Sequence, residues 1–283
     1  MASTPEFIRR ADGQRSRPRG FVGSVGAAFI DGWRRVALSV AIGLAALWRI
    51  GKLRTWRSTV RREFVRHCWQ VGIKALPTTL LTAAIVGMVL VFQVLYWRRD
   101  FGDVLGALNV NTLVLLMLVR EIAPLLVGFI IIGRSATVMI SELVELRVGG
   151  QIHMIDAQGI DVFDYLVAPR IAALAVCSFA LSVVFVLVAL LAGEVLGVAA
   201  GVQERGLFEF LVAATRLLSP TEYLLLPLKS LSIGVLIGVV ACVTALRTAG
   251  AALNVRELLP LGFMRAVVAT FILSGAITAA VVV

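Results

Sequence analysis

Long apolar stretches, separated by shorter segments that hold most of the charged residues, run from about residue 75 to residue 283. Each has roughly 20 residues or more, enough for a helix to cross about 30 Å of hydrocarbon. They predict five membrane-spanning helices, at about residues 75–97, 105–132, 171–202, 223–246 and 262–283. The second and third are longer than a bilayer requires, so they either tilt or continue into water as ordinary helix.

Composition supports this interpretation of the pattern. Of the 283 residues, 59% are hydrophobic and 16% charged, and the mean hydropathy is +0.95. These values lie outside the range of water-soluble domains. We therefore predict an all-α integral membrane protein with one polytopic helical domain.

The distribution of Lys and Arg predicts the orientation, because these residues near membrane segments favour the cytoplasm. Residues 1–74 hold 15 of the 27, and segments 133–170 and 247–265 hold three each. With the N-terminus inside, 21 basic residues are cytoplasmic and five lie outside, while Arg120 is in the membrane. Five spans then place Val283 on the far side.

Before the first span, residues 1–20 read as a basic flexible tail and residues 21–74 as an interfacial helix region, with tryptophans among arginines. The basic residues, with the net charge of +10, could suggest nucleic acid, but anionic lipid headgroups explain them better. A sixth span across 33–50 competes with the interfacial helix. A cleaved signal peptide at 21–30 lacks a small-x-small cleavage pattern.

Cysteine and histidine contribute little chemistry. The three cysteines are far apart in the chain and indicate no disulfide framework. His67 beside Cys68 is the only neighbouring pair of ligand type, and with two histidines in the chain we expect no metal site.

Arg120 and Glu121 lie side by side inside the second apolar stretch, in "LVREIAPLL". Neighbouring positions point about 100° apart on a helix, so the two side chains must face different directions. Pro124 has no N–H, so the Arg120 carbonyl loses its helical partner. Ionisable residues at membrane depth face protein or water. The pair therefore either lines a cavity for charged or amphipathic cargo or forms buried ion pairs that fix helix packing.

Glu194 raises the same question in the third span. Gly193, Gly197 and Gly201 repeat at four-residue spacing around it, which is typical of a close helix contact. Gly234 and Gly238 do likewise in the fourth span. Glu194 is therefore expected to serve packing.

Residues 133–170 form the least lipid-like internal segment. An amphipathic cytoplasmic helix is predicted from about Ser135 to Val148, because Ile140, Leu143 and Val144 share one side. Glu142 and Glu145 lie three apart on another. Gly149 and Gly150 should end the helix. Its apolar residues suggest contact with another protein.

Several motifs in this region resemble the MlaE/YrbE permeases, the membrane subunits of ABC transporters that move lipids with MCE proteins. The motifs are "LVREIAPLLVGFIIIGRSA" (118–136), "SELVELRV" (141–148) and "DYLVAPR" (164–170), and a weaker similarity covers about residues 30–283. The resemblance marks residues 75–283 as the permease domain.

The resemblance implies a bacterial inner membrane protein that pairs with a second permease chain, bears an ATPase subunit on a cytoplasmic coupling helix, and encloses a cavity for phospholipid or another lipid. It assigns Arg120, Glu121 and Gln93 to the substrate pathway, and to ATPase coupling Arg134, Glu142, Glu145, Arg147 and Gln151. The chain has no Gly-x-x-x-x-Gly-Lys-Ser/Thr loop, so it should bind no cofactor itself, and ATP hydrolysis is expected in the partner subunit.

The chain departs from the family pattern at three places. Gly149 and Gly150 replace Thr-Glu before Gln151, Val162 replaces a proline, and Ser274 and Gly275 stand near a C-terminal acidic position. One hypothesis from these departures is that the chain is the divergent member of a permease heterodimer, and a homodimer stays open.

Two other functional classes stay open. A proton-coupled secondary transporter would titrate Glu121 or Glu194, although no convincing internal repeat is found. A non-transporting membrane scaffold would explain the glycine contacts but would leave Arg120 and Glu121 without a role.

Overall fold

The computed structural model describes residues 41–43, 45, 48, 58–100, 110–159, 161–199, 201, 220–248 and 255–282. The chain divides into the units Met1–Ile42 and Gly43–Val283, and every helix from Ser58 onward belongs to the second unit. The predicted tail at 1–20 and the possible signal peptide at 21–30 lie outside the described residues. So do most of the interfacial region before residue 58 and most of the alternative span at 33–50.

Within its described part, the chain consists of helices joined by turns, which confirms the all-α prediction. In chain order they are α2 (Ser58–Cys68), η2 (Trp69–Ile73), α3 (Lys74–Asp100), α5 (Val110–Met117), η3 (Leu118–Ile122), α6 (Ala123–Ile131), η4 (Ile132–Ala136), α7 (Thr137–Val148), α8 (Gln151–Ala157), η5 (Phe163–Val167), α9 (Ala168–Ala199), α11 (Pro220–Thr248) and α12 (Val255–Val282). The η elements are π-helical turns that continue the neighbouring α-helices.

Five helices in the described residues are long and apolar enough to cross a membrane, as predicted. Their bounds are Ser58–Trp97, Leu113–Val148, Phe163–Ala199, Thr221–Leu246 and Leu258–Val281. The first has 40 residues, about 60 Å of helix, so it is twice as long as the hydrocarbon is thick. The extra length is α2, whose exposed arginines make it amphipathic and which runs through η2 into the apolar α3.

Three of the four described π-helical turns lie just before a proline: η2 before Pro77, η3 before Pro124 and η5 before Pro169. Proline has no N–H and its ring crowds the preceding turn, so the regular i to i−4 ladder cannot continue through it. A wider turn accommodates the interruption without ending the helix. The long helices therefore stay continuous through their prolines.

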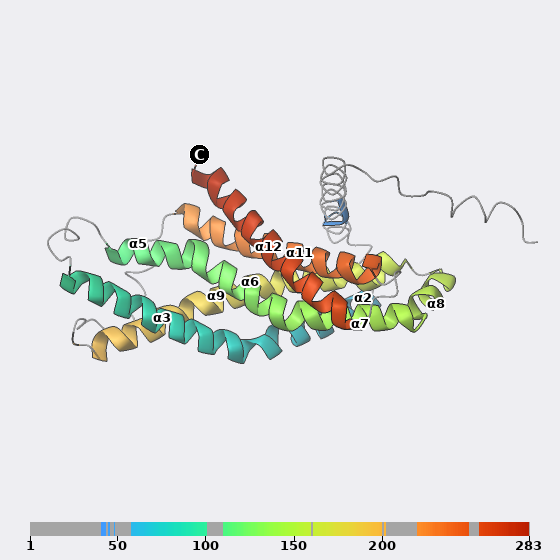
Figure 1. Cartoon of the computed structure of the whole chain (residues 1–283), viewed down its shortest axis with the longest axis horizontal. Helices are drawn as coiled ribbons and strands as arrows, with labels where there is room; N and C mark the ends of the chain where they lie inside the picture. The colour runs from blue at the N-terminus through green and yellow to red at the C-terminus, as the bar shows by residue number, and fades with distance from the viewer. Residues whose placement is uncertain are drawn as a thin grey trace, which may run out of the picture. The chain divides into compact units, whose positions relative to one another are not determined.

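Helix α9 lies at the centre of the packing, against α3, α11, α2 and α6, while α11 also packs on α12 and α7 (Figure 1). Glycines allow the closest approaches. A Cβ on Gly234 would lie 2.6 Å from the Ala175 Cα, and a Cβ on Gly193 would lie 2.8 Å from Val91. The predicted close contacts at Gly193, Gly234 and Gly238 are confirmed.

The inclusion of Gly201 in that contact was wrong. Gly201 follows α9 with a φ of +69°, and a Cβ there would meet no atom of the described residues within 4 Å. Only glycine adopts this left-handed conformation at little cost, so the residue caps the helix end rather than packing against a neighbour.

Candidate functional site

Glu121, on the π-helical turn η3, accepts hydrogen bonds from three side chains on two other helices. Lys229 Nζ on α11 donates at 2.7 Å and Ser274 Oγ on α12 at 3.2 Å, and Thr278 Oγ1 on α12 also donates. Its carboxylate therefore joins the second, fourth and fifth spans. We call Arg120, Glu121, Glu222, Lys229, Ser274 and Thr278 the polar cluster.

Lys229 is fully buried and donates three hydrogen bonds. Besides Glu121, it donates to Thr278 Oγ1 at 2.9 Å and to the Arg120 carbonyl oxygen at 3.0 Å. That carbonyl is the one for which Pro124 supplies no N–H. The lysine thus satisfies both a buried carboxylate and the backbone group left open by the proline, and its three ammonium protons are all used.

The Arg120 side chain points to a different part of α11. Its Nη1 lies 4.0 Å from Glu222 Oε1, an ion pair whose arginine side chain is 25% exposed and whose glutamate side chain is 9% exposed. Arg120 Nε and Nη2 and Glu222 Oε2 are buried and have no hydrogen-bond partner among the described residues. As predicted, the side chains of Arg120 and Glu121 point in different directions and do not form an ion pair with each other.

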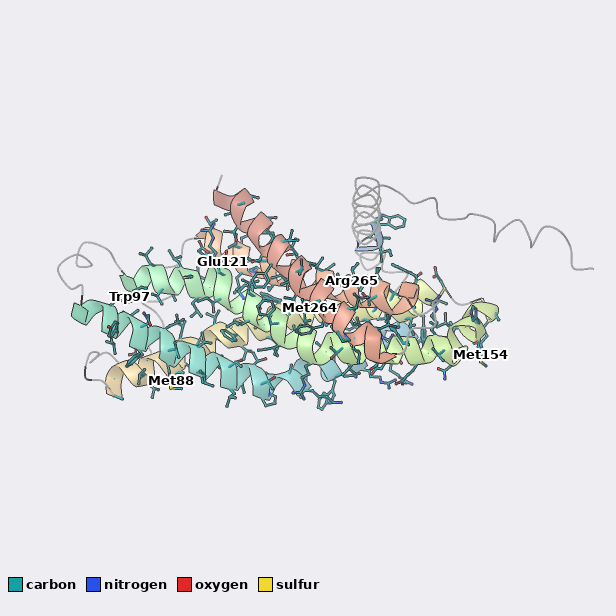
Figure 2. All side chains as sticks on the ribbon, in the orientation of Figure 1. Met88, Trp97, Glu121, Met154, Met264 and Arg265 are labelled. Atoms are coloured by element: carbon teal, nitrogen blue, oxygen red, sulfur yellow. The ribbon has the colours of Figure 1, made fainter. Side chains whose placement is uncertain are left out.

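The polar cluster lies in the half of the helices away from α8. Lys229 is nine residues from the start of α11, about 14 Å along the helix axis. Thr278 is four residues from the end of α12. Figure 2 shows Glu121 in the region where α12 crosses α11, with Met154 on α8 at the opposite end.

The sequence prediction missed most of this cluster. Lys229 was counted among five basic residues outside the membrane, but it is buried inside α11, so the outside count falls to four. A lysine inside the predicted span 223–246 was the signal that could have found it, since charges at that depth face protein. Glu222 and Thr278 gave weaker signals, as they lie near span ends where polar residues are ordinary.

Gln93, the third residue assigned to the substrate pathway, is exposed on α3. It takes no part in the hydrogen bonds that Glu121 and Lys229 make within the polar cluster. The structure therefore places Arg120 and Glu121 in the polar cluster and Gln93 at an exposed position on α3.

A second group of polar side chains joins α2, α7 and α9 toward the other end. Arg170, which is 6% exposed, donates from Nε to His67 Nε2 at 3.0 Å, and its Nη2 lies 3.6 Å from Glu142 Oε2. Gln70 Nε2 donates to Glu142 Oε1 at 2.8 Å. Glu142 is thus bound within this chain on both carboxylate oxygens.

The helix predicted from about Ser135 to Val148 is present as the end of η4 and α7, and the turn at Gly149 and Gly150 ends it, with φ of +72° at Gly150. It is continuous with the second span through η4 rather than separate from it. The suggestion that its apolar residues contact another protein is wrong for Ile140, Leu143 and Val144. All three are buried, because α7 packs against α11 and α12.

Of the remaining predicted coupling residues, Arg134 lies on η4 and the others lie in the α7–α8 tip, which we define as residues 145–157. Arg134, Glu145 and Gln151 are exposed, and Arg147 is half-buried. Val148 and Met154 are also exposed, at 77% and 63%. A mixed surface of charged and large apolar side chains at a helix hairpin is suited to contact with a partner protein.

Glu194 is buried beside the contact of α9 with α3, and its Oε1 has no partner among the described residues. Gly193, next to it, makes the close approach to Val91. The position agrees with the packing role predicted for this part of α9.

Chemically, the Arg120 side chain can pair with an anionic group. Arg120 retains two donor nitrogens beyond its ion pair, and guanidinium pairs with phosphate and carboxylate in a bidentate manner. Among the described residues, no group of three or more His, Cys, Asp and Glu side chains is placed to hold a metal ion.

Comparison with known proteins identifies relatives along most of the chain. A family model described as Permease MlaE matches residues 64–280. The protein TRIGALACTOSYLDIACYLGLYCEROL 1, chloroplastic, of Arabidopsis thaliana is 26% identical over 231 residues, which are 80% of this chain and 61% of that protein. The probable ABC transporter permease protein slr1045 of Synechocystis is 28% identical over 212 residues, 75% of this chain and 79% of that protein.

The intermembrane phospholipid transport system permease protein MlaE of Haemophilus influenzae is 25% identical over 181 residues. The match covers 63% of this chain and 66% of that protein. This chain therefore spans about three fifths of the length of the Arabidopsis relative and about two thirds of the Haemophilus one.

Proposed function

The chain belongs to the MlaE permease family, and on that premise we propose that it is the membrane-spanning permease subunit of an ABC transporter. The transporter would move phospholipid or a related lipid between membranes together with an MCE-domain protein. A partner ATPase subunit would supply the energy. A second permease chain, identical or different, would complete the assembly in the bacterial inner membrane, with the N-terminus in the cytoplasm.

The observation that carries this proposal is the polar cluster inside the membrane-spanning helices. Glu222 and Lys229 are buried, and Arg120 and Glu121 are partly buried. Placing such charges in an apolar bundle costs several kcal/mol unless they are paired. Two of them, Arg120 and Glu222, retain unpartnered atoms after pairing. An unpartnered buried polar atom costs free energy, and a bound lipid headgroup would offset that cost.

The α7–α8 tip supports the ATPase partner. Its exposed side chains lie at the opposite end of the helices from the polar cluster (Figure 2). A protein bound there would reach the cluster through α7, which packs on both α11 and α12. These two helices carry the side chains that donate to Glu121. A displacement of the α7–α8 tip could therefore move the residues of the polar cluster.

The proton-coupled alternative fits the geometry less well. Glu121 accepts from three donors, one of them a buried ammonium, and this arrangement favours a permanently ionised carboxylate over one that exchanges protons. The scaffold alternative gives the charged polar cluster no ligand to bind.

The test is ATP-dependent lipid transfer by the complex purified with its native partners. Donor and acceptor vesicles carrying a fluorescent phospholipid report transfer, and Arg120→Ala should lower its rate at least tenfold while the complex stays assembled. Arg66→Ala is the matched control, since that arginine side chain is 73% exposed on α2. Transfer that continues without ATP would support the proton-coupled class. An unaltered rate in Arg120→Ala would return the cluster to a packing role.

A further inference from the structure

The unpartnered atoms of the polar cluster are hydrogen-bond donors on Arg120 and an acceptor on Glu222, and these two residues form one ion pair. Arg120 offers two buried donor nitrogens, Nε and Nη2, and Glu222 offers one buried acceptor oxygen, Oε2. The paired atoms of the same side chains, Nη1 and Oε1, are 4.0 Å apart, beyond ordinary hydrogen-bond distance. The two residues therefore present a positive and a negative binding point side by side.

The other two charged residues of the cluster, Lys229 and Glu121, already have hydrogen-bond partners. Lys229 is fully buried and has committed its three protons to Glu121, Thr278 and the Arg120 carbonyl. Glu121 is occupied by its three donors. Of the four charged residues in the polar cluster, Arg120 and Glu222 are the two with buried polar atoms that lack a hydrogen-bond partner among the described residues.

The charge balance points to the class of ligand. The cluster contains two basic side chains and two acidic ones, so it carries no net charge when all four are ionised. A purely anionic headgroup would leave an uncompensated negative charge in a region of low dielectric. A headgroup that carries one charge of each sign would keep the balance and satisfy both binding points.

We propose that the Arg120–Glu222 pair recognises the zwitterionic headgroup of a phospholipid that carries a phosphodiester and a primary ammonium. The phosphate oxygens accept from Arg120 Nε and Nη2, and the ammonium donates to Glu222 Oε2. This deepens the proposed function and rests on it. Glu222 is then the residue that selects this headgroup over an anionic one such as phosphatidylglycerol.

Lipid retention by the purified complex tests this selection without ATP. The complex is incubated with vesicles of equimolar phosphatidylethanolamine and phosphatidylglycerol, re-isolated, and its bound lipid measured by mass spectrometry. The wild type should retain mainly phosphatidylethanolamine. Glu222→Gln should shift the ratio of the two lipids about tenfold toward phosphatidylglycerol, which is what losing one charge-assisted hydrogen bond amounts to.

Glu194→Gln is the matched control, because it makes the same change at another buried glutamate with an unpartnered oxygen, on α9. Its lipid ratio should equal that of the wild type. A probe lipid covers the case in which Glu222→Gln fails to assemble. N-acetylated phosphatidylethanolamine keeps the phosphate but lacks the ammonium, and the wild type should retain about tenfold less of it.

The outcomes separate this inference from the proposed function. Active ATP-dependent transfer with equal retention of both lipids would overturn the headgroup selection and leave the transporter standing. Equal retention of the acetylated and unmodified phosphatidylethanolamine would also overturn the headgroup selection and leave the transporter standing. A wild-type complex that neither retains nor transfers any phospholipid would overturn both.

Discussion

Replacing Lys229 with methionine should destabilise the protein more than any other single change in the polar cluster. Methionine keeps the unbranched shape of the side chain but removes all three hydrogen bonds of the ammonium. Glu121 would lose its cation, and the Arg120 carbonyl would lose its donor. Removing one partner of a buried ion pair costs about 3–5 kcal/mol, because the remaining charge stays buried without compensation.

For a chain of this size, ~2–4 °C of melting temperature corresponds to each kcal/mol, so Lys229→Met should melt about 6–20 °C below the wild type. The measurement is thermal unfolding of the detergent-solubilised protein, followed by intrinsic fluorescence. Lys74→Met is the matched control, since that lysine is exposed at the start of α3. It should melt within about 2 °C of the wild type, as surface substitutions do.

A double-mutant cycle with Glu121→Gln distinguishes the ion pair from a general loss of packing. The double variant has neither charge to leave uncompensated, so it should melt at a higher temperature than Lys229→Met alone. The reasoning would be refuted by a Lys229→Met protein as stable as the wild type. Strict additivity of the two single changes would refute the pairing of these side chains.

The other predictions concern the helix contacts and the α7–α8 tip. Gly234→Ala should destabilise the protein by about 1–3 kcal/mol, because its Cβ would meet the Ala175 backbone, whereas Gly275→Ala, with nothing within 4 Å, should be neutral in the same melting assay. Glu145→Lys should weaken copurification of the ATPase subunit without changing the melting temperature. Glu142→Lys should lower both the copurification of the ATPase subunit and the melting temperature, since the Glu142 carboxylate binds Gln70 and Arg170. Full ATPase recovery with Glu145→Lys would place the docking surface elsewhere.

The five spans could be predicted because each depends on local composition, and apolar length is a property of a continuous stretch of chain. The ends were harder to place. The amphipathic α2 continues through η2 into the apolar α3 without a break in the helix. The composition therefore changes at a point where the backbone conformation stays helical. The same holds between the second span and α7.

The polar cluster was predictable only in part, because its partners are far apart in the chain. The divergence of Arg120 and Glu121 followed from helix geometry, and the open carbonyl followed from Pro124. Lys229 lies 108 residues after Glu121 in the chain. It donates to the Glu121 carboxylate and to the Arg120 carbonyl only because of the way α11 packs. Local patterns carry no information on that packing, so Ser274 and Thr278 could not be assigned either.

The π-helical turns bear on how the chain is compared with its relatives. A π turn holds one residue more than an α turn, so the positions beyond it are rotated by about 100° relative to an uninterrupted helix. Deleting a single residue there would remove the extra residue of the wide turn, whereas the same deletion elsewhere in a span would rotate an entire buried face out of its contacts. Single-residue gaps in an alignment with the relatives at 25–28% identity should therefore fall within Leu118–Ile122 and its three counterparts. The assignment of residues to helix faces must therefore be made separately before and after each π-helical turn.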